Sequence, residues 1–295
     1  MTGTQTLELF TEPDERFATQ VRELGFAVLA DAFSPDEVEA FNDETLRLCR
    51  SDLSTLARGQ GAAAADESDD VALRRYAAIH HPDKISELAF RQLSNPRIVS
   101  ALTAVIGPDV KCMQSMLFIK ASGKPGQAWH QDEYFIPTRD RSLYAAWIAL
   151  DDCRLDNGCL WVLPGSHRPG IIYPVEAQDN LDEFGCTIEA HGFPYRNEDA
   201  IPVEIPAGSA LIFNGYLLHR SLRNSGERGY RRSLVNHYMS CSSMLPWQLK
   251  AGEHVGESDY RDVTIVAGTD PYAYRGYEQL RVAYIRRDGN TGCDA

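Results

Sequence analysis

A histidine and an aspartate two positions apart, His130 and Asp132, are the residues of this sequence with the most distinctive chemistry. They lie in the stretch 127–135, which reads Gln-Ala-Trp-His-Gln-Asp-Glu-Tyr-Phe. Side chains alternate along a β-strand, so a strand over 128–136 would aim both residues at one point. One imidazole and one carboxylate are two of the three protein ligands in the triad that binds non-haem Fe(II). Because His-x-Asp is also common in hydrogen-bonded surface pairs, other residues must decide whether the pair binds metal.

His219 is the candidate third ligand, and an arginine that follows it is a candidate anion site. Alternation over 216–222 places His219 on a face that a barrel could turn toward His130. The polar residues that follow predict a turn, and a hairpin folded about Ser225 would place Arg231 directly opposite His219. Arg231 is therefore expected to point into the cavity and Arg232 away from it. A shift of the register by one residue would exchange the two arginines.

A buried guanidinium beside a metal site needs an anionic partner, because an unpaired charge in a protein interior is very costly. The distal carboxylate of 2-oxoglutarate would be such a partner for Arg231, since it accepts two parallel hydrogen bonds that a lysine could not copy. Ser221 could donate a further hydrogen bond to this carboxylate, and Trp147 could wall the pocket. Each has a plainer interpretation, Ser221 as a strand hydroxyl and Trp147 as a core aromatic. His219 alone would similarly be read as a core histidine, and only the joint occurrence favours a shared site.

The composition is that of a soluble globular protein without a polyanionic partner. The 295 residues are 43% hydrophobic and 24% charged, which is sufficient for a sizeable core. A formal net charge of −13 argues against binding to nucleic acid or to an anionic membrane surface. The 7 cysteines contain no Cys-x-x-Cys pair, which favours reduced thiols in the cytoplasm over disulfides or a structural zinc site. Neither a signal-peptide pattern nor an apolar run approaching the ~20 residues of a membrane helix is present.

Hydrophobic patterning divides the chain into a helical first part and a β-rich second part. The elements expected before position 110 are helices over 15–24, 35–49 and 96–107, a strand over 25–30, and a mobile surface loop over 58–70. Ser34 and Glu37 match the capping box that begins a helix. Short apolar or alternating runs follow, at 110–120, 128–136, 144–150, 158–163, 201–205, 209–213, 216–222 and 231–239.

This order predicts a mainly β fold with flanking helices, in which two antiparallel sheets form a jelly-roll or cupin-like barrel. We expect a single domain over 1–295. Its parts would be a mainly helical N-terminal cover at 1–109, a barrel core at 110–240 with a long insertion loop at 164–200, and a C-terminal cover at 241–295 without a clear strand.

The motifs together resemble the phytanoyl-CoA dioxygenase family of Fe(II)/2-oxoglutarate oxygenases. The matching pieces run through most of the chain: Gly25-Phe-Ala-Val-Leu, Gln114-Ser115 with Lys120, Trp129-His-Gln-Asp132, Trp147-Ile-Ala-Leu-Asp-Asp152, Asn157-Gly-Cys-Leu160, Pro164-Gly-Ser-His167, His219-Arg-Ser221 with Asn224, and Arg231-Arg232. The resemblance implies a double-stranded β-helix that binds iron through His130, Asp132 and His219. It implies that 2-oxoglutarate is bound by Arg231 in a pocket lined by Ser221, Trp147 and Gln114. One departure is that the arginine follows the distal histidine by twelve residues, whereas the family usually has eleven, so Arg232 remains a rival anchor.

The expected function is therefore hydroxylation, or another oxidation, of an unactivated C–H bond in a small metabolite or natural-product intermediate. Fe(II), 2-oxoglutarate and O2 would take part, ascorbate is expected to assist, and succinate and CO2 would be released. The residues expected to shape the substrate pocket, together with the loops 58–70 and 164–200, are Trp129, Glu133, Tyr134, Phe135, Met116 and Phe118. Two alternatives remain open: a cupin-type metal-dependent isomerase or hydrolase that does not use 2-oxoglutarate, and a non-catalytic ligand-binding barrel. The sequence does not decide between a monomer and a homodimer.

Overall fold

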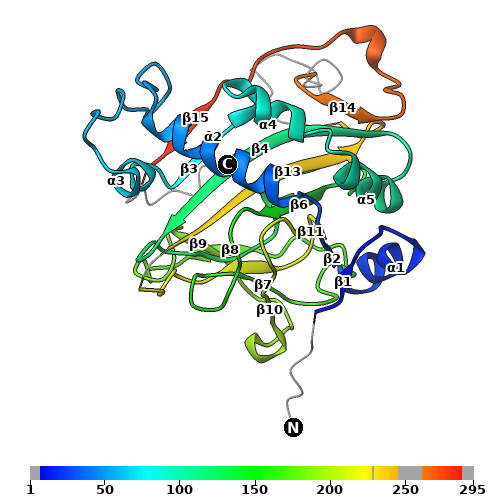
Figure 1. The fold of residues 1–295 in the computed structure, drawn as a ribbon. Helices are drawn as coiled ribbons and strands as arrows, with labels where there is room; N and C mark the ends of the chain where they lie inside the picture. Colours follow the sequence, from blue (N-terminus) through cyan, green and yellow to red (C-terminus); the bar gives the residue numbers. More distant parts are fainter. Residues whose placement is uncertain (1–6, 228, 245–260, 288–295) are drawn as a thin grey trace, which may run out of the picture.

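Two facing β-sheets form the centre of the molecule, and helices cover the outer face of the larger one (Figure 1). The computed structural model describes residues 7–227, 229–244 and 261–287. The strands of the larger sheet are, in spatial order, β1 (Leu9–Phe10), β2 (Phe26–Leu29), β11 (Ala210–Asn214), β6 (Tyr144–Ala149), β13 (Tyr230–Ser240), β4 (Val110–Ala121), β3 (Ala78–His80) and β15 (Tyr284–Arg286), with β14 (Thr264–Ala267) also paired to β4. Those of the smaller sheet are β10 (Ile201–Val203), β7 (Leu160–Val162), β12 (His219–Ser221) and β5 (Gln127–His130). The predicted mainly β architecture, a double-stranded β-helix with flanking helices, is confirmed.

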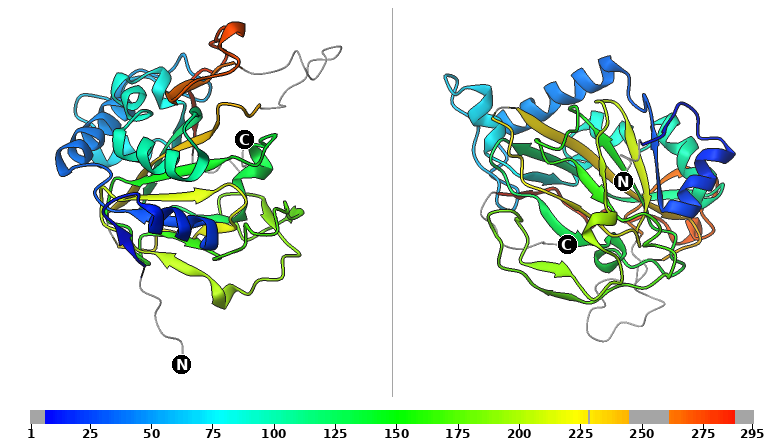
Figure 2. Two further views of the ribbon diagram at one scale, coloured as in Figure 1. Left: turned by 90° about the vertical axis from the view of Figure 1, so that its right-hand side faces the viewer. Right: turned by 90° about the horizontal axis from the view of Figure 1, so that it is seen from below.

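The helices pack on the side of the larger sheet that faces away from the smaller sheet (Figure 2). They are α1 (Glu15–Leu24), α2 (Pro35–Arg50), α3 (Asp69–Arg74), α4 (Glu87–Gln92) and α5 (Pro96–Ile106). The shorter helical segments are the 3-10 turns η1 (Pro82–Lys84), η2 (Asn197–Asp199) and η3 (Ala273–Arg275) and the one-turn α6 (Asp132–Phe135), which faces the space between the sheets. One core cluster joins Phe41 of α2 and Leu102 of α5 to Ile148 and Leu234 of the sheet. The helices therefore bury one face of the larger sheet and leave the other to face the smaller sheet.

Alternation along the central strands supplies the second core. Trp147 and Val235, the neighbours of Ile148 and Leu234, belong to a separate cluster that lies between the two sheets. On β13, Arg231 and His237 lie an even number of residues from Val235, so their side chains also face the space between the two sheets. Arg232 faces the helix side, where it forms a bidentate ion pair with Asp151 at 2.9 and 2.6 Å.

The predicted helix ends are confirmed by their caps. Ser34 accepts a hydrogen bond from the backbone N–H of Glu37, whose carboxylate in turn accepts from the backbone N–H of Ser34. Asn95 caps α5 in a similar way, by accepting hydrogen bonds at its N-terminus. After α1, Gly25 adopts a φ of 90°, a left-handed conformation that glycine enters without steric cost.

The predicted strand over 128–136 was wrong in its second half. The strand β5 ends at His130, and Asp132 begins the helical turn α6, so strand alternation does not bring these two residues together. Gln131 makes the bend between them: its side-chain amide donates to the carbonyl oxygens of Tyr216 and Ile171 and accepts from the backbone N–H of Tyr173. A buried side chain thus replaces the hydrogen bonds that a continuing strand would have formed.

Two further regions contain strands that the sequence did not predict. The insertion 164–200 holds a small hairpin of β8 (Val175–Ala177) and β9 (Ile188–Ala190). The C-terminal part supplies β14 and β15, which extend the larger sheet by pairing with β4 and β3. These strands were not predicted because each has only three or four residues, which is too short for a hydrophobic periodicity to be recognised. The division into one domain with three parts stays a prediction.

The predicted hairpin between His219 and Arg231 was also wrong. His219 lies on β12 of the smaller sheet and Arg231 on β13 of the larger sheet, where its cross-strand partner is Lys120 of β4. The connection crosses from one sheet to the other instead of folding back on itself. Arg231 still faces the space between the sheets, but the reason is that alternate side chains of β13 point to that side.

The cysteine prediction holds in part. Cys49, Cys112, Cys153, Cys159 and Cys241 are free and buried. Cys186 takes part in a disulfide, so the expectation of reduced thiols throughout does not hold for it.

In the described part of the chain, no helix combines the length and the apolar character that a bilayer crossing requires.

Replacement of Gly126 by alanine should test the contact between β5 and β12. An added Cβ would lie 1.8 Å from the carbonyl oxygen of Ser221, so the two strands must separate. We expect Gly126→Ala to destabilise the protein by ~1–3 kcal/mol and to weaken metal binding, as measured by chemical unfolding and by Fe(II) titration. Gly61→Ala is the matched control, because an added Cβ meets nothing within 4 Å there. Equal effects of the two substitutions would contradict this account of the packing.

Candidate metal centre and cosubstrate pocket

His130, Asp132 and His219 converge at one point between the sheets. His130 and His219 are direct partners in the pairing of β5 with β12, and their ring centroids lie 4.0 Å apart. The Nε2 atoms of His219 and His130 lie 3.5 and 3.8 Å from Oδ1 of Asp132. One ligand atom from each residue lies within 4.8 Å of the others, and all three residues are buried. The predicted residues thus form a group that could hold one metal ion.

Backbone hydrogen bonds fix which imidazole nitrogen faces the centre. Nδ1 of His130 lies 2.8 Å from the carbonyl oxygen of Ala128, and Nδ1 of His219 lies 3.0 Å from that of Leu217. A carbonyl oxygen only accepts, so each Nδ1 must carry the proton. Each Nε2 is then left with a lone pair aimed at Asp132, which is the form of histidine that coordinates a metal.

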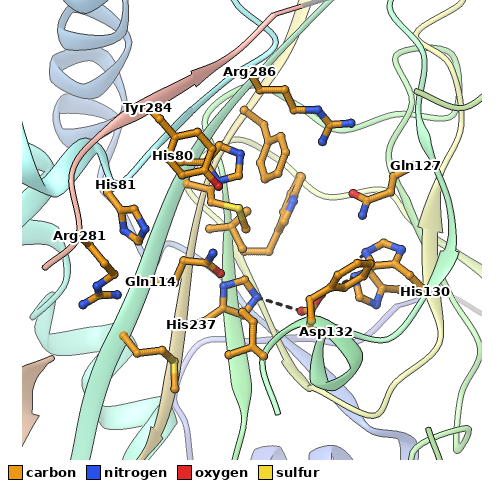
Figure 3. A pocket seen from close by; sticks show the side chains of 18 of the residues that line it. His80, His81, Gln114, Gln127, His130, Asp132, His237, Arg281, Tyr284 and Arg286 are labelled. Carbon is orange, nitrogen blue, oxygen red and sulfur yellow. Dashed lines mark hydrogen bonds and ion pairs between the residues drawn. The ribbon is translucent and has the colours of Figure 1, made fainter. Parts of the chain in front are cut away.

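Asp132 is held as a carboxylate by the imidazoles around it. Oδ2 of Asp132 lies 3.0 Å from Nε2 of His237, which comes from β13 (Figure 3). Burial opposes ionisation, but His219, His237 and His130 together lower the pKa of Asp132 below its ordinary value. Burial, followed by the neighbouring His219, lowers the pKa of His130 to about 3. A buried carboxylate beside two imidazoles whose Nε2 lone pairs face it suits a divalent cation.

Two adjoining cavities extend from this centre. The larger has a volume of about 490 Å³ and reaches the three candidate ligands. The smaller, of about 110 Å³, includes Arg231 and Lys120 in its wall. The two cavities share Trp147, Ser221 and Gln127 among their lining residues.

Two buried cations lie in the smaller cavity without a carboxylate partner. Arg231 is 4% exposed, lies 5.3 Å above the ring of Trp147 and donates to Ser233 at 2.8 Å, whereas its Nε has no hydrogen-bond partner. Nζ of Lys120 donates to Oγ of Ser221 at 3.0 Å and to the carbonyl oxygen of Leu222 at 2.7 Å. Burial, followed by the charge of Arg231, lowers the pKa of Lys120 well below its ordinary value. Among the described residues neither cation forms an ion pair, so a bound anion fits this end of the cavity.

Comparisons with known proteins identify the family of this chain. The family model described as Phytanoyl-CoA dioxygenase (PhyH) matches residues 21–233. The chain belongs to the phytanoyl-CoA dioxygenase family. A phytanoyl-CoA dioxygenase of Arabidopsis thaliana is 39% identical over 117 residues, which are 39% of this chain and 40% of that protein. The matched part of the chain spans between 40% and 66% of the length of such curated relatives.

Solved structures share the fold of this family member. The non-heme monooxygenase ThoJ in its apo form has a TM-score of 0.67 at 21% identity, over 92% of this chain and 88% of that chain. The epimerase SnoN in complex with Fe3+, alpha ketoglutarate and nogalamycin RO has a TM-score of 0.60 at 19% identity, over 94% of this chain and 96% of that chain. At such identities the likeness concerns the fold.

Three residues predicted for the substrate pocket of this PhyH-family chain lie elsewhere. Trp129 packs with Phe193 outside the cavity and donates to Asn197, because it alternates with the inward-facing His130. Glu133 is buried against Thr138, and Tyr134 is 41% exposed at the surface. The loop 58–70 does not line the cavity, and the insertion 164–200 contributes only Gly185, to the smaller cavity.

The remaining predicted residues lie along the cavities, so their roles stay predictions. Phe135, Met116 and Gln114 line the larger cavity, and Phe118, Trp147 and Ser221 line both. His237 was missed, although the parity of Arg231 on the same strand could have indicated that it faces the site. His80 and Arg281 were also missed, because they come from terminal regions predicted to be covers. No signal in the sequence placed them near the metal.

Removal of the imidazole at 237 should weaken metal binding without removing a ligand. A residue that orients a ligating carboxylate typically contributes about 10–100-fold to metal affinity. We expect this loss for His237→Phe in Fe(II) titrations, and a partial recovery for His237→Gln, whose amide can donate to Asp132. His191→Phe is the control, since His191 pairs with Glu176 away from the site. Unchanged affinity in His237→Phe would show that Asp132 is held by other contacts.

Proposed function

We propose that this protein is an Fe(II)- and 2-oxoglutarate-dependent oxygenase that hydroxylates an unactivated C–H bond of a small molecule. The observation that carries the proposal is the adjacency of two features: three converging ligand atoms, and a buried guanidinium whose Nε lacks a hydrogen-bond partner. A 2-oxoglutarate molecule has one end that chelates a metal and a second carboxylate that needs a cation, so it would satisfy both features at once.

His130, Asp132 and His219 would hold the iron and leave coordination positions open for the cosubstrate and O2. When bound, iron and 2-oxoglutarate supply the oxidation, in which 2-oxoglutarate is converted to succinate and CO2 as the substrate C–H bond is hydroxylated. The residues of the protein would position the cosubstrate. Arg231 would bind the distal carboxylate, Lys120 would hold the Ser221 hydroxyl in place, and Trp147 would line the cosubstrate pocket.

The alternatives fit the site less well. A cupin-type isomerase or hydrolase would use the metal ligands but has no need for two unpaired buried cations beside them. A non-catalytic barrel would have no reason to keep two ligand imidazoles oriented by backbone hydrogen bonds and the third ligand, Asp132, oriented by His237. The solved neighbour SnoN is described as an epimerase, so the fold does not by itself select hydroxylation. The cytoplasmic location and the assistance of ascorbate stay predictions.

Replacement of Asp132 by alanine should abolish the reaction. The carboxylate is the one anionic member of the candidate ligand set, so we expect Asp132→Ala to lose succinate formation from 2-oxoglutarate, measured by coupled assay under air with added Fe(II). Asp140→Ala removes an exposed carboxylate and should retain activity. Turnover by Asp132→Ala would exclude this carboxylate from the iron site.

Neighbouring arginines provide a test of the cosubstrate pocket. Arg231→Met should raise the concentration of 2-oxoglutarate needed for half-maximal rate by more than about 30-fold, because a buried charge pair typically contributes 2–5 kcal/mol. Arg232→Met breaks the ion pair with Asp151 and should lower stability while leaving that concentration nearly unchanged. If Arg232→Met raised the 2-oxoglutarate concentration for half-maximal rate more than Arg231→Met does, the anchor would be Arg232 and the proposed role of Arg231 would be wrong.

A further inference from the structure

The wall of the larger cavity that lies opposite the metal centre has no part in the proposed chemistry. It is formed by β3, by His81 that follows it and by the C-terminal residues 280–286, and we call it the polar wall. Figure 3 shows His80, His81 and Arg281 of this wall across the cavity from Asp132. Residues from distant parts of the chain therefore face the same space as the candidate metal ligands.

The charged groups of the polar wall are already compensated. The guanidinium of Arg281 forms an ion pair with Asp262 at 3.2 Å, and Asp262 also pairs with Lys84 at 2.9 Å. A carboxylate oxygen of Asp83 lies 4.0 Å from Nδ1 of His81. Over the lining of the larger cavity, two arginines are balanced by two aspartates. Because Fe(II) and the dianion of 2-oxoglutarate would add no net charge, the loaded cavity favours a neutral ligand.

His80 presents an uncharged imidazole without hydrogen bonds to the cavity. The residue is 3% exposed, and neither of its ring nitrogens bonds to any described residue. Its ring stacks on that of Tyr284, at 4.2 Å between centroids and 15° between planes. Burial, followed by the charge of Arg286, lowers the pKa of His80 to about 3. One ring nitrogen is therefore a free donor and the other a free acceptor.

Gln114 offers a second unsatisfied acceptor beside this imidazole. Its Oε1 is buried and accepts no hydrogen bond from the described part of the chain. Met116 of β4 is the cross-strand partner of His80, and Gln114 lies two residues away on the same face of β4. Buried acceptors are nearly always satisfied, so this pair needs a ligand that donates a hydrogen bond. Carboxylates, esters, ethers and ketones have no proton to donate.

The register of the larger sheet gives the distance between this polar pair and the metal centre. Gln114 of β4 is the cross-strand partner of His237 on β13, and His237 bonds Asp132. Since β4 lies between β3 and β13, two strand spacings, ~10 Å, separate His80 from His237. Met116 lies on β4 between them and supplies an apolar surface. The cavity of about 490 Å³ would also hold 2-oxoglutarate, so the remaining space suits a small molecule.

We propose that the substrate is a small uncharged alcohol with an apolar body, whose hydroxyl group donates to Oε1 of Gln114 and accepts from the imidazole of His80. The body lies against Met116 and presents a C–H bond to the metal centre. One oxygen atom of O2 enters this C–H bond and the other enters succinate, so the product is a diol. The inference rests on the proposed function, because it assigns the cavity to the substrate of that reaction.

The test compares alcohols with isomeric ethers that accept a hydrogen bond but cannot donate one. The pairs are hexan-1-ol with 1-methoxypentane, cyclohexanemethanol with methoxycyclohexane, and 2-phenylethanol with benzyl methyl ether. Binding to protein loaded anaerobically with Fe(II) and 2-oxoglutarate is measured by equilibrium dialysis and gas chromatography. We expect at least one alcohol to bind more tightly than its ether by about tenfold or more, because the ether leaves a buried acceptor unpaired.

Two substitutions at His80 separate hydrogen bonding from packing. His80→Phe keeps a ring that can stack on Tyr284 but removes both nitrogens, so it should bring the ratio of alcohol to ether affinity close to one. His80→Gln restores a donor and an acceptor and should recover part of the preference. If His80→Phe fails to fold, Gln114→Met serves instead, because it has a similar length and no polar atom that could pair with a hydroxyl group. His191→Phe removes an imidazole outside the cavity and should keep the full ratio.

The outcomes distinguish this inference from the proposed function. Equal binding of alcohols and ethers, no binding of any probe, or tighter binding of hexanoate, cyclohexanecarboxylate or phenylacetate than of the matching alcohol would overturn the inference. Succinate formation is measured separately under air. A preference for alcohols without succinate would refute the proposed function alone, and succinate formation without that preference would refute this inference alone.

Discussion

The buried carboxylate of Asp132 is the constraint on which the arrangement of the site depends. Three imidazoles contact it, from β5 and β12 of the smaller sheet and from β13 of the larger sheet. An anion at this depth is stable only while these groups surround it. The pairing of β5 with β12, the bend at Gln131 and the crossing of the chain between the sheets all serve to bring them together.

One strand contributes to every part of the cavity. Along β13, Arg231 lines the smaller cavity, where we propose that an anion binds, Val235 lines the larger cavity, and His237 bonds the carboxylate of Asp132 in the candidate metal centre. These residues share a face because a strand repeats every two residues. The opposite face of the same strand, with Leu234 and Tyr238, is packed against helices and keeps the strand fixed. Rigid packing on one side thus positions the chemistry on the other.

The sequence predicted the residues of the site better than the way in which they meet. His130, Asp132, His219 and Arg231 could be predicted, because a metal triad and a buried cation need particular residue types in a β-rich chain. Their geometry could not, since Asp132 is placed by a helical turn and Arg231 by a different sheet from His219. The polar wall of His80 and Arg281 was not predictable at all. It depends on the pairing of β3 with β15, two three-residue strands more than two hundred positions apart, and such long-range contacts leave no local pattern.

The most direct measurement of the central claim is an anaerobic titration of Fe(II)-loaded protein with 2-oxoglutarate, followed by visible absorption. If His130, Asp132 and His219 hold the iron beside Arg231, a weak charge-transfer band should develop to saturation at one 2-oxoglutarate per chain. The same titration of metal-free protein should give no band. Intact, Fe(II)-bound protein that gives no band at saturating 2-oxoglutarate would contradict the account.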